Sequence, residues 1–341
     1  MRRSTRLGLV ILAALLVAGG GYTAFWFLVA RRIEAGIVDW SLSQQADKID
    51  LSWQKMRVSG YPAAFRVDLG SAALRDGAIT PSPELHIPML SGTARPWNFS
   101  DWRLEAPEGF TADFATGAGA PTKLIAQTAD GVVSIETEGG WTLWLTLRET
   151  TVEAGAPVLV GSAHATLAVP PRPSRGSAHP LMSLAVEASR IKLPAAIAPL
   201  GDTVDELDFA ATGKGAVPSG KLADALAAWR DAGGKIELDN LHLKWGALDA
   251  TATGTIALDQ ELQPTSGFSG AIQGYDQILT ALVQNGQMRA SDAGLARIAL
   301  TFLAKAGPDG KPEIRTAFTI QNGQMFLGPA KLGRVPRITW E

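Results

Sequence analysis

Uncharged, mostly apolar residues fill the chain without a break from residue 7 to residue 30. Three arginines precede this run and two follow it directly. A helix needs roughly 20 apolar residues to cross a bilayer core about 30 Å thick. The pattern therefore predicts an N-terminal signal anchor, or transmembrane helix, over residues 1–30.

A cleaved signal peptide is the alternative interpretation of the same residues. Its hydrophobic region would cover residues 9–18 and end at the three glycines that follow. Signal peptides have a short hydrophobic region that ends in an A-x-A-like cleavage site. No such site lies at the glycines, and the apolar run resumes after them. An uncleaved anchor is therefore favoured.

The arginines around the apolar run also indicate an orientation. The amino terminus and three arginines lie before the run, against two arginines after it. Positive charge beside a transmembrane helix tends to stay on the cytoplasmic side. The interpretation is a single-pass protein of the inner (plasma) membrane whose C-terminal body lies in the periplasm.

Beyond the anchor, helical spacing gives way to strict alternation. Ile33, Ile37 and Trp40 recur every three or four residues, which predicts a stalk helix that continues to about residue 48. From residue 49 onward, apolar and polar residues alternate, as in strands with one dry and one wet face. The alternation changes parity between Trp53 and Met56, so a bulge or bend is expected there.

Two dipeptides mark hairpins in this alternating region. Period-2 runs flank Gly139-Gly140, and another pair of runs flanks Asn322-Gly323. Asn-Gly between alternating runs is the strongest short-range hairpin signal, because both residues tolerate the left-handed backbone of a two-residue turn. Antiparallel neighbours are therefore expected at both places.

For the body as a whole, the pattern predicts a dozen or more strands, three or four helices and many turns. The helices are expected as insertions near residues 221–231 and 276–305. The predicted class is mainly β (α+β): an antiparallel, strongly curved sheet or a sandwich or groove, preceded by the membrane helix. A Pro-rich linker at residues 170–176 divides the body into a first β-rich domain with the stalk, residues 31–170, and a second, residues 180–341.

Long alternating strands create a continuous apolar face that few helices are available to cover. Large exposed apolar patches usually mark binding sites or membrane contacts. The clearest alternation in the second half of the chain supplies the candidate binding residues, namely Leu248, Ile256, Leu258, Phe268 and Ile272. A second sheet that closes over this face is the alternative arrangement.

Composition narrows the possible functions by exclusion. The chain has no cysteine, which excludes disulfides, thiolate catalysis, Cys-ligated zinc and a lipoprotein signal. The formal net charge is −2, so the chain lacks the basic footprint of a nucleic-acid-binding protein. We expect no nucleic acid among its partners.

Motifs that carry chemistry are incomplete. Residues 215–222 nearly fit a P-loop, but Leu222 stands where a magnesium-binding hydroxyl is required. None of the four histidines forms an HxH or HExxH pair, and His164 and His242 fall on the polar parity of predicted strands. Four acidic residues between 202 and 208 lack EF-hand spacing and are interpreted as a solvated loop and strand edge. We therefore expect no catalytic residue, metal ligand or cofactor.

Three stretches carry a family resemblance. They are WRDAGGKIELDNLHLKWGALDATATGTIALD from residue 229, GYP at residues 60–62, and NGQMFLGPAKLGRVP from residue 322. They resemble family twenty-one twenty-five of the bacterial domains of unknown function, whose members are anchored in the inner membrane and occur mainly in alphaproteobacteria. The resemblance covers nearly the whole chain after the anchor and implies no activity.

A second, architectural similarity is to the AsmA-like proteins. Residues 234–248 and the strand at 254–259 look like the C-terminal strands of those proteins. The similarity implies an N-terminal membrane helix, a periplasmic β-groove and a role in phospholipid movement or envelope homeostasis. This chain is shorter than most AsmA-like proteins.

These observations favour a cell-envelope protein that handles lipid and is not an enzyme. The expected partners are the inner membrane and a phospholipid or other acyl-chain ligand. The alternative is an envelope scaffold that contacts a protein partner and carries no lipid. An enzyme is the third possibility, and it would need clustered polar residues that the sequence does not show.

Overall fold

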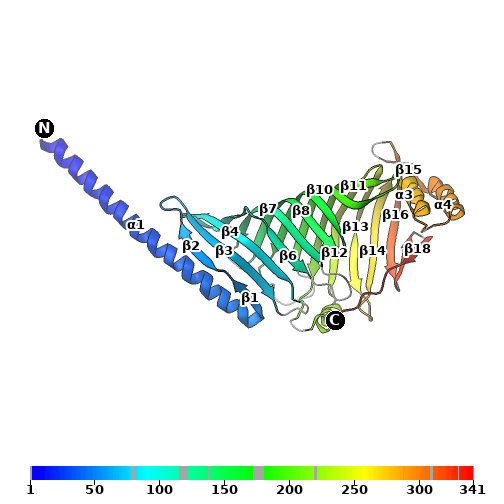
Figure 1. Ribbon diagram of the computed structural model, residues 1–341, viewed down its shortest axis with the longest axis horizontal. Helices are drawn as coiled ribbons and strands as arrows, with labels where there is room; N and C mark the ends of the chain where they lie inside the picture. The colour runs from blue at the N-terminus through cyan, green and yellow to red at the C-terminus, as the bar shows by residue number, and fades with distance from the viewer. Residues whose placement is uncertain are drawn as a thin grey trace.

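A long helix joined to one wide sheet makes up the computed structural model (Figure 1). The structure describes residues 2–340 apart from 78–81, 115–121, 137–138, 172–179, 219–220, 287, 308–309 and 329. The helices are α1 (Arg2–Gln44), α2 (Leu222–Asp231), α3 (Tyr275–Gln284) and α4 (Ala290–Leu303), with a 3₁₀ turn at Gln45–Asp47.

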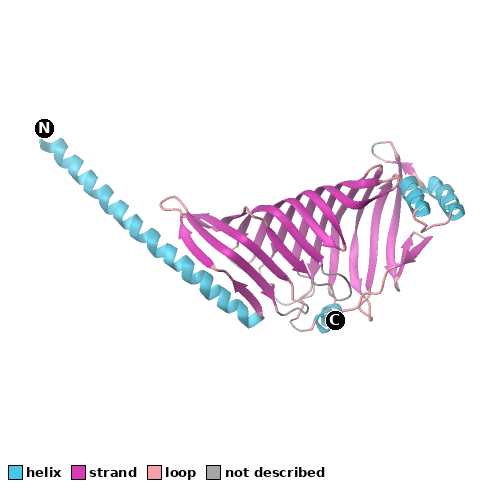
Figure 2. Ribbon diagram, in the orientation of Figure 1, coloured by secondary structure: helices cyan, strands magenta, loops and turns pink. Residues whose placement is uncertain are grey.

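Strands account for most of the body (Figure 2). In chain order they are β1 (Ile49–Ser52), β2 (Lys55–Ser59), β3 (Phe65–Asp76), β4 (Glu84–Arg95), β5 (Asn98–Ala106), β6 (Phe110–Phe114), β7 (Thr122–Ile135), β8 (Trp141–Ala154), β9 (Ala156–Val169), β10 (Pro180–Ile197), β11 (Gly201–Lys214), β12 (Lys235–Trp245), β13 (Leu248–Leu258), β14 (Pro264–Gln273), β15 (Lys305–Ala306), β16 (Pro312–Gln321), β17 (Gln324–Leu327) and β18 (Ala330–Arg334).

The sheet is an antiparallel meander in which almost every strand pairs with the next. Three places depart from this rule. Both β1 and β2 pair with β3, β5 and β6 together fill the space between β4 and β7, and β14 pairs with β16. The predicted mainly antiparallel, strongly curved sheet with an N-terminal apolar helix is confirmed, and the described strands form a single sheet rather than a sandwich.

The local elements expected from the sequence are present. Asn322 and Gly323 have φ angles of 53° and 67° and connect β16 to β17, as a two-residue turn with left-handed residues requires. Ile135 pairs with Trp141 across the Gly139 turn. The parity change after Trp53 is the break between β1 and β2, which pair with separate parts of β3.

One line of irregular residues crosses the long strands at matching positions. On each strand a residue drops out of the regular pairing, while its neighbours on both sides stay in register. We call this line the crease. Its residues are Ser71 in β3, Pro88 in β4, Gln127 in β7, Glu149 in β8, Gly161 in β9, Arg190 in β10 and Asp205 in β11.

The crease has a direct effect on which residues face inward. Side chains alternate along a strand, so one extra residue shifts the apolar set from odd to even positions. In β8, Leu145 and Leu147 lie before the crease, and Thr150 and Val152 lie after it on the same face. Bulges also bend the strand and increase its twist. The two halves of each strand therefore turn their apolar sides toward one another.

Three of the bulge residues are not glycine yet have left-handed backbone. The φ angles of Ser71, Glu149 and Arg190 are 50°, 49° and 53°. Residues other than glycine rarely have a positive φ, and those that do are held in that conformation by the surrounding structure. The core cluster supplies those surroundings, because its buried residues line the crease on the apolar side. They are Ala106, Ala126, Ala129, Leu147, Ala163, Ala188, Ile191 and Val204.

The apolar face is left largely uncovered. The chain exposes 20,968 Å². A compact monomer of 35.9 kDa exposes about 13,000 Å². The projecting part of α1 accounts for some of the excess, and the one-layer sheet for the rest. The sheet therefore has two open faces over much of its width.

α1 and α3 pack against the sheet near its two ends, and α2 packs where β11 ends and β12 begins, with Trp229 donating a hydrogen bond to the Lys214 carbonyl (2.8 Å). At the first end, Trp26 of α1 stacks on Phe65 of β3 with ring centroids 5.0 Å apart and an interplanar angle of 8°. At the other end, Ile278 and Ala281 of α3 cover Leu248. Among the described residues, no helix contributes to the core cluster or to the apolar side chains over β4 to β9.

The predicted division into two β-rich domains stays a prediction. β9 and β10, which flank the proposed linker, pair from Leu159–Lys192 to Ala168–Ser183. β9 and β10 therefore belong to one sheet. The linker segment itself lies mostly outside the described residues.

Candidate functional site: an apolar groove

An apolar cavity lies on the crease, over strands β3 to β9. The strand segments on one side of the crease contribute Leu74, Leu85, Ile87, Phe110 and Leu124. The segments on the other side contribute Leu90, Leu104, Leu143, Leu145 and Leu167. The site thus forms where the bend brings two rows of alternating apolar side chains together, and we call it the groove.

Its size and lining suit an apolar ligand. The volume is about 580 Å³, within the roughly 300–1,000 Å³ of typical small-molecule sites. Charged side chains occur at its margins, where Arg75 of β3 and Glu84 of β4 form an ion pair of 3.2 Å beside Asp76. Residues from seven strands contribute to the groove, so no single sequence motif encodes it.

A few polar atoms are buried on the same face of the sheet. Thr150 and Ser266 have hydroxyl oxygens, and Trp245 has an indole nitrogen, with no hydrogen-bond partner in the described part of the chain. Thr150 follows the crease in β8, and Trp245 packs against the core cluster along it. Buried polar groups are normally paired. These three atoms are therefore buried without a partner among the described residues.

The five binding residues expected from the sequence share one face of β13 and β14. The register places Ile256 opposite Ser266, Phe268 opposite Gly254 and Ile272 opposite Ala250. Leu248, however, is buried beneath α3, and Ile272 packs against the same cluster. These residues extend the apolar face beyond the groove, and their role in binding stays a prediction.

Sequence reasoning did not locate the groove itself. The alternation of Leu143, Leu145 and Leu147 was visible, as was that of Phe65, Val67 and Leu69. Such runs come together because bulges lie at matching positions on many strands. In the sequence, each bulge is visible only as a change in which positions, odd or even, are apolar. Aligning those parity changes across strands is the signal that points to the crease.

The opposite face of the sheet is polar along a continuous row. Consecutive neighbours across nine pairings are all polar, from Asp68 at one end to Thr251 at the other. The row is Asp68, Ser91, Glu105, Asp130, Thr146, His164, Glu187, Asp208, His242 and Thr251. This row makes the face of the sheet opposite the groove polar, while the groove side is apolar.

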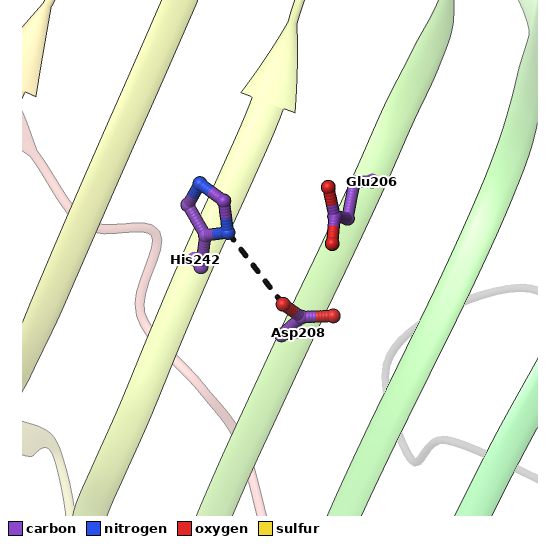
Figure 3. A group of neighbouring side chains, drawn as sticks. All are labelled: Glu206, Asp208 and His242. Atoms are coloured by element: carbon purple, nitrogen blue, oxygen red, sulfur yellow. Dashed lines mark ion pairs between the residues drawn. The ribbon is translucent and has the colours of Figure 1, made fainter. Parts of the chain in front are cut away.

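Glu206, Asp208 and His242 form a titratable cluster on that polar face (Figure 3). Their ligand atoms lie within 4.8 Å of one another. His242 Nδ1 lies 3.5 Å from Asp208 and Nε2 lies 3.0 Å from Asp249, so carboxylates hold both ring nitrogens. A metal ion would have to displace one of these contacts. The geometry is that of a cross-strand polar cluster.

The near-P-loop and two further histidines of the sequence lie elsewhere in the chain. The near-P-loop leads into α2, whose N-cap is Lys221, and residues 219–220 lie outside the described part of the chain. His164 is 3.2 Å from the Thr146 hydroxyl on the neighbouring strand. His179 lies outside the described residues as well.

Asp68 is an acid on the polar face that two side chains hold by hydrogen bonds. Its carboxylate accepts hydrogen bonds from Ser91 (2.6 Å) and Arg66 (2.9 Å). Burial raises the pKa of the Asp68 carboxyl, but these bonds outweigh it, so this pKa lies below its ordinary value. A carboxyl with a lowered pKa in the folded state stabilises the fold above its unfolded pKa of about 3.9, and loses that contribution as the pH falls through the folded pKa.

Asp68→Asn is therefore expected to lower the free energy of unfolding by about 1–2 kcal/mol at neutral pH. The difference from the unsubstituted chain should shrink as the pH falls below about 4. Urea unfolding between pH 3 and pH 7 measures both effects. Glu108→Gln, at an exposed turn residue, is the control. Equal losses for the two variants, or a loss that does not change with pH, would contradict this account.

Comparison with known protein families matches residues 26–336 to the family described as "Uncharacterized protein conserved in bacteria (DUF2125)". The chain belongs to this family. The match begins at Trp26, the α1 residue that stacks on the sheet, and it includes all the strands that line the groove. For this DUF2125 protein, neither a search of curated proteins nor a search of solved structures gave a match.

Proposed function

We propose that this DUF2125 protein is anchored in the inner membrane by α1 and binds the acyl chain of a phospholipid or similar lipid in its groove. The observation that carries the proposal is the open apolar groove over β3 to β9. The proposed role is binding and handling of lipid for envelope homeostasis, without catalysis.

Physical chemistry supports an acyl chain as the occupant. Transfer of apolar surface out of water contributes about 0.8 kcal/mol for each buried methylene group. A groove lined by leucine and phenylalanine and exposed to water gains most from an unbranched apolar ligand. The long axis of the crease follows the sheet, so an extended chain fits better than a compact solute.

The anchor supplies the second support. α1 is long and apolar enough to span a membrane, and residues such as Leu15, Leu16 and Val17 expose more than half of their side chains. Large apolar side chains on an isolated helix are stable in a bilayer and costly in water. The protein would then stand beside a reservoir of the proposed ligand.

Lipid mass spectrometry on the purified full chain tests the proposal. We expect stoichiometric phospholipid or fatty acid after extraction in mild detergent, and uptake of added lipid by a delipidated sample. A chain that carries no lipid and takes up none would refute the binding function.

The proposed location has a separate test. A reporter that is active only in the periplasm, fused to the C-terminus, should be active in cells. A silent reporter on a well-expressed fusion would place the body on the cytoplasmic side instead.

One observation favours the scaffold alternative. α4 buries Ala293 but exposes large apolar side chains, including Leu295, Ile298 and Phe302, the last of which is 86% exposed. Water-exposed helices usually place such residues inward. Site-specific photocrosslinking from Phe302 would test this alternative. One stoichiometric protein partner on a lipid-free chain would favour the scaffold over the lipid-binding function.

A further inference from the structure

The body of the protein touches α1 inside its apolar run as well as beyond it, where Ile33 joins the same cluster. The turn between β2 and β3, residues 60–64, lies beside α1 residues 22–27, and Figure 1 shows this corner of the sheet next to the helix. Three hydrogen bonds join the two segments: from the Tyr22 hydroxyl to the Pro62 carbonyl, between Thr23 Oγ1 and the Tyr61 hydroxyl (2.7 Å), and from Trp26 Nε1 to the Ala64 carbonyl (3.1 Å).

The length of the helix fixes the depth of this contact. At 1.5 Å per residue, a bilayer core about 30 Å thick takes about 20 residues. The uncharged run begins at Leu7, directly after Arg6, so the far boundary of the core falls near Phe27, and a tilt of about 20° moves it by only about one residue. Residues 22–27 therefore lie at or just inside that boundary, and the turn bonded to them lies at the same level.

The turn at residues 60–64 has few polar groups that lack a partner, as a position at the edge of the bilayer core requires. Residues 60–65 contain no charged side chain. In lipid, backbone polar groups must find partners within the protein. The carbonyls of Pro62 and Ala64 accept bonds from Tyr22 and Trp26, the Ala64 amide donates to the Gly60 carbonyl, and proline has no N–H to satisfy.

The neighbouring turn, between β4 and β5, also carries an exposed aromatic residue, Trp97. Phe65 pairs with Ala94 at the end of β4, so residues 96–97 lie next to the first turn. Trp97 is 73% exposed, and the Arg95 guanidinium lies 6.0 Å from its ring. Tryptophan and an arginine that can reach the headgroups are typical of the membrane–water interface.

We propose that the turns at residues 60–64 and 96–97 rest in the interfacial layer of the bilayer that α1 crosses. The anchor and the first edge of the sheet then form one membrane-docked unit. The inference rests on the anchoring role proposed above for α1. It adds that the sheet itself contacts lipid, at the edge beside which the groove begins.

The absence of cysteine makes a direct depth measurement possible. Single cysteines carrying a spin label would be placed at Ala63 and Trp97 of the full chain, reconstituted in phosphatidylcholine–phosphatidylglycerol vesicles. Trp144→Cys on the polar face and Ala195→Cys in β10 are matched controls, since both parent residues are also exposed. Leu15→Cys reports whether α1 is inserted. Electron paramagnetic resonance compares collisions of each label with oxygen, which concentrates in lipid, and with a water-soluble nickel complex.

We expect oxygen collisions to exceed nickel collisions at positions 15, 63 and 97, and the reverse at positions 144 and 195. A water-like ratio at both 63 and 97 with a lipid-like ratio at position 15 would overturn the docking proposal, and a water-like ratio at all three positions would overturn the anchoring on which it rests. A negative result for membrane docking of the two turns is distinguishable from a negative result for lipid binding in the groove. Water-exposed labels on a chain that still holds lipid would reject the docking alone, and lipid-exposed labels on an empty groove would reject the binding alone.

Discussion

Replacing Leu143 with aspartate should empty the groove. Leu143 lies in the groove and is flanked in register by Val133 and Leu167, so a carboxylate there would face only apolar neighbours. Burying an unpaired carboxylate against an acyl chain costs several kcal/mol, and each 1.4 kcal/mol is a factor of about ten in affinity. The bound lipid measured by mass spectrometry should fall by at least about tenfold.

The adjacent residue provides the matched control. Thr142 points to the opposite face, where it pairs with Ser134 and Ala168. Thr142→Asp introduces the same charge one residue away and should leave lipid binding unchanged. Leu143→Asn, which is neutral and of similar size, guards against misfolding, and thermal unfolding of each variant checks the fold. Equal lipid content in the two aspartate variants would exclude the groove as the binding site.

Phe65→Ala should give the largest loss of stability of any single substitution proposed for this chain. Phe65 is 0% exposed and packs between Trp26 of α1 and Phe99 of β5. Truncating a buried phenylalanine costs about 3–5 kcal/mol, because transfer energy is lost and a cavity remains. The urea midpoint of the body, followed by near-ultraviolet circular dichroism in detergent, should fall accordingly.

Phe302 offers the same substitution in an exposed setting. Its side chain is 86% exposed on α4, so Phe302→Ala should change the free energy of unfolding by less than about 0.5 kcal/mol. Phe65→Ala should also loosen α1 from the sheet, and limited proteolysis near residues 31–48 would detect this. Equal midpoints for the two variants would show that the contact between α1 and β3 contributes little to stability.

Much of the local structure followed from the sequence alone. The alternation of Phe65, Val67 and Leu69 predicted a strand with one buried face, and the structure buries Phe65 and Val67. The Asn322-Gly323 turn and the helices near residues 222–231 and 275–303 also lie where they were expected. These features depend on neighbouring residues, because period, turn geometry and helix spacing are local properties of the chain.

The candidate site could be predicted only in part. The sequence pointed to an apolar sheet face and placed the binding residues on β13 and β14, whereas the groove lies over β3 to β9. Leu248 and Leu143 look alike in sequence, since both sit in clean alternating runs. One is covered by α3 and the other lines the groove, and that difference arises from packing between segments far apart in the chain.

The sequence by itself determined an uncharged helix of membrane-spanning length, a body of alternating antiparallel strands and the turns that join them. Only the tertiary structure decided that these strands form one sheet, that their bulges align as the crease, and that the sheet meets α1 within its apolar run. The physical reason is that side-chain alternation fixes which faces are apolar, but register between strands and contacts between distant segments decide which apolar faces meet.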